Sequence, residues 1–392
     1  MILFKLAYRN LVGAGLRTWL NVIVLSFSFV VIIWTQGLYD GMYDQALHAK
    51  TDWEIGGGEF WHKNYDPYDP LSLEKSYGSL AKSLQELVQA GKATPILITQ
   101  ATMYPDGRMV PVLLKGIDPN QNILQIPGAA LKDSAVCCNL PALIGERMAK
   151  SSHLQKGDFV TLRWQDVYGA FDAADAKIVQ LMRTPVPTID NRQIWVPLDS
   201  LRKMLQAPGQ ATIVVLAPGV EAPSNLSDWE FKSPDYLLSD VREIVQTKSV
   251  SSAIFYFFLV VLALLAIFDT QVLSIFRRRK EIGTLMALGM TRSEVIRLFT
   301  IEGAFHGILA LIAAAIYGTP ILIYFQKNGL PLPSYMDSYG IALGQKLIPT
   351  YGVGLVLGTV LIILIAVTVV SFLPTRRISR LKPTDALRGK WS

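Results

Sequence analysis

The sequence predicts an integral membrane protein with four transmembrane α-helices and a large extracytoplasmic α+β domain inserted between the first and second helices. Two observations carry this prediction. The chain of 392 residues is 51% hydrophobic and only 17% charged, which is too apolar for an ordinary soluble protein of this length. Its long apolar runs lie near the N-terminus and in the last third, whereas residues 40–248 have the mixed polar composition of a folded domain.

Charge is also unevenly distributed along the chain. Residues 40–248 contain 20 lysine and arginine residues against 25 aspartate and glutamate residues, so the net charge of +6 comes from the flanking apolar segments. A basic excess beside apolar helices indicates orientation in a bilayer and argues against a nucleic-acid-binding surface. We therefore expect contact with membrane lipids and no nucleic-acid partner.

Four segments are long and apolar enough to cross the hydrocarbon core, which takes about 20 residues of helix. They are residues 20–39, 250–276, 300–325 and 350–373. The first could pass for a signal peptide, but it lacks a small-x-small cleavage signature, and we interpret it as a retained anchor. The basic, partly amphipathic lead-in before it predicts an interfacial elbow helix, with a frayed lead-in as the alternative. Residues 1–39 thus form the first of three regions, followed by 40–248 and 249–392.

Arginine and lysine predict the topology. Both the 277–299 loop and the 374–392 tail are rich in them, whereas the 327–349 loop has only Lys327 and Lys346. Because basic loops remain in the cytoplasm, both termini and the 277–299 loop are predicted to be cytoplasmic. The 40–248 domain and the short 327–349 loop are then predicted to be periplasmic, with the chain in a bacterial inner membrane.

Small residues in the last two predicted spans are spaced to let helices approach closely. We expect these residues to pack against protein: Gly303, Gly307, Ala310, Ala314, Gly318, Gly354 and Gly358.

The 40–248 domain alternates strand-like and helix-like runs, which predicts an α+β fold. The predicted strands are 95–104, 110–117, 158–164, 176–182, 193–198 and 211–216, and the predicted helices are 79–90, 141–154 and 198–207. Turn signals lie at 105–107 and 156–158. With about 200 residues, the domain is large enough for one core plus a smaller subdomain.

Signs of catalysis or metal binding are weak in this chain. The four histidines fall in no metal-ligand spacing, and no Gly-x-Ser-x-Gly motif is present. Cys137 and Cys138 are adjacent, so a disulfide between them would close a strained ring, and two ordinary thiols are the simpler interpretation. We expect no metal site, and the cysteines leave the redox compartment open.

The 277–299 loop is the most informative segment. Gly289 is placed to end a short helix, and Thr291 with Glu294 forms a capping box for the next, so we expect a helix, a sharp turn and a second helix. Ile282, Leu285 and Leu288 recur at helical spacing just outside the bilayer. Such an apolar patch needs a protein partner or the lipid surface to cover it.

Three polar residues lie inside or beside the predicted spans: Asp269, Glu302 and His306. A charge at mid-membrane would cost about 2.5–3.5 kcal/mol on insertion scales. A proton relay is one interpretation. The structural alternative is that these groups snorkel, pair with the arginine cluster, or fix the bend between loop and helix.

Two cytoplasmic segments closely resemble one family. The run Arg279, Lys280, Glu281, Ile282, Gly283, Ala287, Leu288, Gly289, with Glu302 and Gly303 at the next span, resembles the MacB/FtsX-type permeases of ABC transporters, the type VII or mechanotransmission class. The tail resembles the ending of the same family through Pro374, Arg376, Arg377, Leu381, Lys382, Pro383 and Asp385 to Leu387. The layout of one span, a large outer domain and three further spans also fits that family.

The resemblance implies a permease that moves its outer domain without forming a channel. A separate ABC ATPase dimer, binding ATP and Mg, would push on a coupling loop made of Arg279, Lys280, Glu281, Ile282, Gly283, Leu285, Ala287, Leu288 and Gly289. The chain has no G-x-x-x-x-G-K-[ST] phosphate loop, so we expect neither ATPase activity nor a cofactor bound by the chain itself. Permeases of this family work in pairs, so a second, identical or related permease subunit is a further expected partner.

Features of the outer domain look most like the LolC/LolE-like permeases, which implies extraction of lipoproteins from the inner membrane. FtsX-like signalling to a periplasmic cell-wall hydrolase and MacB-like tripartite export are the alternatives. A membrane-embedded enzyme using Glu302 and His306 is a third. The sequence leaves the cargo, the identity of the second permease and any periplasmic adaptor open.

Overall fold

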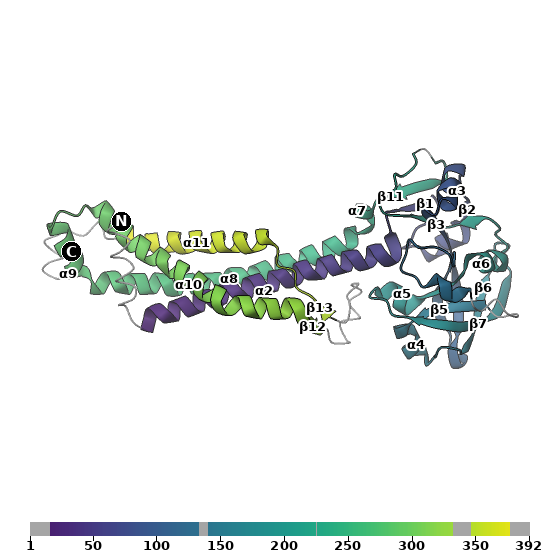
Figure 1. Cartoon of the computed structure of the whole chain (residues 1–392), viewed down its shortest axis with the longest axis horizontal. Helices are drawn as coiled ribbons and strands as arrows, with labels where there is room; N and C mark the ends of the chain where they lie inside the picture. The colour runs from purple at the N-terminus through teal and green to yellow at the C-terminus, as the bar shows by residue number, and fades with distance from the viewer. Residues whose placement is uncertain (1–15, 133–139, 225, 332–345, 377–392) are drawn as a thin grey trace. The chain divides into compact units, whose positions relative to one another are not determined.

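The computed structural model describes residues 16–132, 140–224, 226–331 and 346–376 (Figure 1). The predicted elbow helix, Cys137, Cys138 and the tail beyond Arg376 lie outside these residues. The chain divides into two compact units. The helical unit comprises residues 1–42, 245–330 and 348–392, and the sheet unit comprises residues 43–244 and 331–347.

Four long apolar helices confirm the predicted number of membrane-spanning segments. They are α2 (Leu16–Lys50), α8 (Ser239–Arg277), α10 (Arg292–Asn328) and α11 (Val353–Thr375). A short helix, α9 (Arg279–Ala287), lies between α8 and α10, and the two-residue strands β12 (Leu330–Pro331) and β13 (Lys346–Leu347) lie between α10 and α11.

Helices α2 and α8 are longer than the apolar stretches that predict them. Polar residues 40–50 continue α2, and polar residues 239–249 begin α8. Neither stretch contains proline, so nothing in the backbone interrupts the helical hydrogen bonds. Apolarity therefore marks the part of a helix that can lie in lipid, while helix-compatible residues set its actual length.

Close approach within the helical unit depends on several of the predicted small residues. A Cβ on Gly318 would collide with Val30 of α2, and a Cβ on Gly307 would lie 2.9 Å from Leu364 of α11. Ala310 and Ala314 are buried in the apolar core of the unit. The prediction for Gly354 and Gly358 is not met within the described chain, because each faces open space.

Between residues 43 and 244, the described part of the sheet unit contains eleven strands and several short helices. Its strands are β1 (Glu59–His62), β2 (Gly78–Ser79), β3 (Ala93–Tyr104), β4 (Val110–Ile117), β5 (Leu140–Gly145), β6 (Phe159–Gln165), β7 (Phe171–Met182), β8 (Gln193–Pro197), β9 (Gln210–Ala211), β10 (Ile213–Leu216) and β11 (Trp229–Lys232). Its helices are η1 (Thr51–Ile55), η2 (Pro70–Lys75), α3 (Lys82–Gln89), η3 (Pro105–Gly107), η4 (Gly128–Leu131), α4 (Glu146–Ser152), α5 (Pro187–Arg192), α6 (Leu198–Met204) and α7 (Pro234–Leu237).

One predicted helix is partly wrong. We expected residues 141–154 to be helical, but Leu140–Gly145 form strand β5, and only Glu146–Ser152 form helix α4. The apolar run of β5 is buried between β7 and β8, so it satisfies its backbone in the sheet. Short, fully apolar runs fit a buried strand and a buried helix equally well, and this is where periodicity alone fails.

The main sheet closes into a six-stranded barrel. Nine strands follow the order β11-β1-β10-β3-β4-β8-β5-β7-β6, and an additional pairing joins β3 to β6. Strand β3 has twelve residues and serves two partners on one side: residues 93–96 pair with β10, and residues 101–104 pair with β6. Strand β3 thus belongs both to the barrel and to a small extension formed by the three strands β10, β1 and β11.

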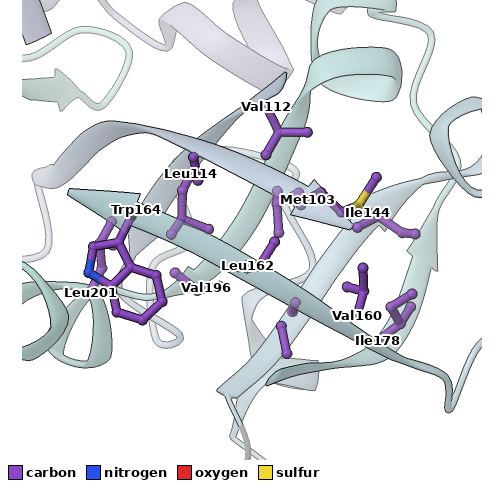
Figure 2. Packing of buried hydrophobic residues seen from close by; sticks show 14 of the residues in the cluster. Met103, Val112, Leu114, Ile144, Val160, Leu162, Trp164, Ile178, Val196 and Leu201 are labelled. Atoms are coloured by element: carbon purple, nitrogen blue, oxygen red, sulfur yellow. The ribbon is translucent and has the colours of Figure 1, made fainter. Parts of the chain in front are cut away.

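Two apolar cores lie on the two faces of this sheet. Inside the barrel, Met103, Leu114, Leu162 and Ile178 are fully buried and point toward one another (Figure 2). On the opposite face, alternating residues such as Ile96 and Ile98 pack with Trp195 and with residues from α5 and η4. Burial on both faces explains the continuous apolar runs of β3, β5 and β8.

Candidate functional site

The segment 277–299, which we call the coupling segment, has the predicted helix, turn and helix (Figure 1). Gly289 has a φ of +101°, a left-handed conformation that suits glycine, and Met290 donates its backbone N–H to Leu285. The Thr291 side chain accepts from the Glu294 N–H, while the Glu294 carboxylate accepts from the Thr291 N–H at 2.8 Å. The predicted capping box is confirmed, and it begins α10.

The apolar residues of α9 divide between an internal core and an exposed surface. Ile282 is fully buried against Val295 and Phe299 of α10, so this contact fixes α9 on α10. Leu288, by contrast, is 80% exposed at the end of α9. Of the three residues predicted to offer a docking patch, Ile282 is therefore internal, Leu285 is half-buried, and Leu288 is the exposed one.

Arg278, which follows α8 and caps α9, links α9 to α10 through its guanidinium group. Its Nε donates to Glu281 Oε2 of α9 at 2.7 Å, and its Nη1 donates to Glu302 Oε2 of α10 at 2.9 Å. The group also lies over the Phe299 ring, 4.9 Å from its centroid. Because the guanidinium hydrogen-bonds to Glu281, the pKa of that carboxyl lies below its usual value, and the pKa of Arg278 lies above its own.

In the sequence, Arg278 belongs to the basic stretch of the 277–299 loop, and no individual role is predicted for it. A sequence signal for the ion pair was present, because Arg278 and Glu281 are three residues apart and on a helix would face one another.

The other residues of the predicted coupling loop differ in their exposure. Gly283 is buried, whereas Lys280, Glu281, Ala287 and Gly289 are exposed, and the side chain of Arg279 lies outside the described residues.

The predicted polar residues of the spans have different surroundings. Glu302 and His306 are both buried and one turn apart, and His306 Nδ1 lies 3.1 Å from the backbone oxygen of Glu302. Glu302 pairs with Arg278, which matches the structural interpretation of this residue. Asp269 is not brought to them: its side chain is exposed on α8, away from any hydrogen bond or ion pair with the described residues.

A groove of about 930 Å³ lies on the outer wall of the barrel, between η2 and strands β3, β4 and β6. Its lining is apolar over Pro111, Leu113 and Phe171, and polar at Arg163 and Arg192. Two carboxylates, Asp66 and Asp69, line it as well, but both accept hydrogen bonds from backbone amides of their own loop. The groove thus combines an apolar surface with charged groups of both signs.

Across the described ranges, no three histidine, cysteine, aspartate or glutamate side chains gather at a point where they could hold a metal ion.

Comparison with known proteins finds similarity for part of the chain. Residues 253–383 match the family model for the FtsX-like permease C-terminal region. The uncharacterized ABC transporter permease MJ1507 of Methanocaldococcus jannaschii is 25% identical over 171 residues, which cover 41% of this chain and 39% of the relative. The match thus spans well under half of that relative's length.

Among solved structures, the extracellular domain of the noncanonic ABC-type transporter YknZ from Gram-positive bacteria was found. The likeness covers 42% of this chain and 83% of that chain, with 11% identity and a TM-score of 0.27, a value that does not establish a common fold. Residues 253–383 are thus similar to the C-terminal region of FtsX-like permeases, and part of the chain is similar to an ABC transporter permease.

Proposed function

We propose that this chain is the permease subunit of an ABC transporter and that a separate ATPase dimer drives it through the coupling segment. The observation that carries the proposal is the set of ion pairs made by Arg278, which joins α9 to α10 at one end of α9 while Leu288 is exposed at the other end. A push on α9 would be passed to α10 through the Ile282 core and the Glu302 ion pair. No catalytic step is assigned to the chain itself.

Leu288 and Glu281 are the residues proposed to meet the ATPase. Leu288 supplies an exposed apolar side chain of the kind that anchors an interface, and Glu281 is fixed in place by Arg278. A position on the cytoplasmic side follows from the basic residues around α9. A second permease subunit would give each ATPase of the dimer its own coupling segment.

The test is co-purification of the tagged chain with its ATPase from a mild detergent. We expect Leu288→Asp to abolish recovery of the ATPase, because a charge replaces the exposed apolar contact. Leu71→Asp is the matched control, since Leu71 is 74% exposed in the sheet unit and should leave recovery unchanged. Full recovery with the Leu288 variant would refute the proposed contact.

A second test separates binding from coupling. We expect Arg278→Gln to retain the ATPase but to uncouple its hydrolysis from transport, because α9 remains seated through Ile282 while the link to Glu302 is lost. The measurement is ATPase activity alongside transport in proteoliposomes. Equal loss of both activities would place Arg278 in binding rather than in coupling.

For the cargo, we propose lipoproteins extracted from the inner membrane, in keeping with the LolC/LolE-like features of the sequence. The groove supports an amphipathic cargo, because Leu113 and Phe171 offer apolar surface beside the guanidinium groups of Arg163 and Arg192. Mass spectrometry of material bound to the purified complex tests this. Loss of bound lipoproteins on changing Leu113 and Phe171 to glutamate would support the proposal, whereas recovery of a cell-wall hydrolase or an adaptor would favour signalling or tripartite export.

A further inference from the structure

Three buried polar side chains from three helices of the helical unit are left with an unpaired atom. Gln271 of α8, His306 of α10 and Ser371 of α11 are at most 4% exposed. Within the part of the chain that the structure describes, Gln271 Oε1, His306 Nε2 and Ser371 Oγ have no hydrogen-bond partner. Buried polar atoms in a membrane protein need such a partner, because lipid offers none.

Two of the three side chains, Gln271 and Ser371, meet beside Gly303 of α10. A Cβ at that position would collide with Ser371 Oγ and lie 3.0 Å from Gln271 Nε2. His306 follows three residues later and so shares the same face of α10. The glycine brings α10 close to α11 at the point where the polar side chains of α8 and α11 converge.

Hydrogen-bonding chemistry specifies the missing partner. His306 Nδ1 lies 3.1 Å from the Glu302 carbonyl oxygen, which can only accept, so Nδ1 carries the proton, and Nε2 of the neutral ring is an acceptor. Gln271 Oε1 is also an acceptor, whereas the Ser371 hydroxyl can donate. The complementary molecule donates two hydrogen bonds and accepts one, which describes a buried water with its usual three partners.

A cation fits the same atoms poorly. The anionic group closest in sequence is Glu302, and both of its carboxylate oxygens already accept from Arg278 at 2.9 and 3.1 Å. The positive guanidinium at this position would also repel a second cation.

We propose that Gln271, His306 and Ser371 form an internal water site that joins α8, α10 and α11 beside the Arg278–Glu302 ion pair. Water exchanges partners easily, so α10 can shift against its neighbours without leaving a polar atom unpaired. The site is a hydrated contact between helices of the membrane region. Its role in transmitting movement rests on the proposed function, whereas its existence does not.

Radiolytic hydroxyl-radical footprinting of the full chain in nanodiscs tests for the water directly, because ordered internal water generates radicals where it is bound. We expect His306 to be oxidised several-fold faster than Phe29, a fully buried aromatic residue in the apolar core of the same unit. Gln271→Leu should slow the labelling of His306. Labelling of His306 no faster than that of Phe29 would overturn the proposal.

Thermal unfolding provides a second, independent readout. Each of Gln271→Leu, His306→Leu and Ser371→Ala removes one partner of the water, and we expect each to lower the melting temperature. The triple variant removes every group that needs the water, so its melting temperature should be higher than that of the least stable single variant. A triple variant whose losses simply add would show that the three groups act independently. Neither measurement involves an ATPase or a cargo, so failure here leaves the proposed function untouched.

Discussion

The barrel of the sheet unit and the contact of α8, α10 and α11 in the helical unit are both buried, but they are held together differently. The barrel interior is filled by aliphatic and aromatic side chains such as Leu114 and Leu162. The helical contact instead contains a partly buried ion pair, Arg278 with Glu302, and a glycine approach at Gly303. Apolar packing gives a stable and unchanging core. Paired polar groups can exchange partners, which suits the movement that the proposed function requires.

The largest effect is expected at the ion pair. Glu302→Leu leaves the Arg278 charge without its buried partner, and removing one member of such a pair costs about 3–5 kcal/mol. Thermal unfolding of the purified chain measures this loss. Adding Arg278→Leu should restore part of the stability, and Glu281→Gln is the control because that carboxylate is 49% exposed. A much smaller loss of stability in Glu302→Leu would show that the ion pair contributes little to the stability of the helical unit.

A slightly smaller effect is expected in the barrel. Leu162→Ala creates a cavity among fully buried neighbours and should cost about 2–5 kcal/mol. Phe159→Ala on the same strand is the matched control, since Phe159 is 54% exposed and should change stability little. The unfolding free energy in urea gives both numbers. Equal effects of the two variants would contradict the assignment of the barrel interior.

Glu59 is one of several buried polar residues of the sheet unit, and it sharpens the comparison. Burial raises the pKa of Glu59 to about 7, against a hydrogen bond from Trp61 that favours the charged form. The folded state therefore holds this proton after the unfolded chain has lost it, so stability falls as pH rises from about 4.5 to about 7, by about 3 kcal/mol. Glu59→Gln should flatten this part of the stability–pH profile. An unchanged profile would show that Glu59 titrates normally.

The smallest effect is expected at the start of α10. Thr291→Ala removes the side chain that caps the helix and should cost about 1 kcal/mol. Thr291→Ser keeps the hydroxyl and serves as the rescue variant. The melting temperatures of the two variants are compared with that of Thr284→Ala in α9. This comparison separates the loss of the cap from the effect of removing a threonine hydroxyl elsewhere in a helix. If serine and alanine behave alike at position 291, the capping box adds nothing to stability.

Local signals predicted much of the candidate site. The turn at Gly289 and the cap at Thr291 depend on residues within three positions of one another, so the sequence contains all that they need. The docking patch was predicted less well. Ile282 and Leu288 look alike as apolar residues, and only the packing of Val295 and Phe299 decides that the first is buried and the second exposed.

By itself, the sequence determined the four apolar helices, the α+β character of the inserted domain and the turn of the coupling segment, because composition and short-range periodicity specify local structure. The tertiary structure decided the rest. The barrel closes through residues about 60 positions apart in β3 and β6, Arg278 meets Glu302 across 24 positions, and β5 is a strand because its neighbours supply the hydrogen bonds. These features depend on which segments meet in space, and no local pattern encodes that.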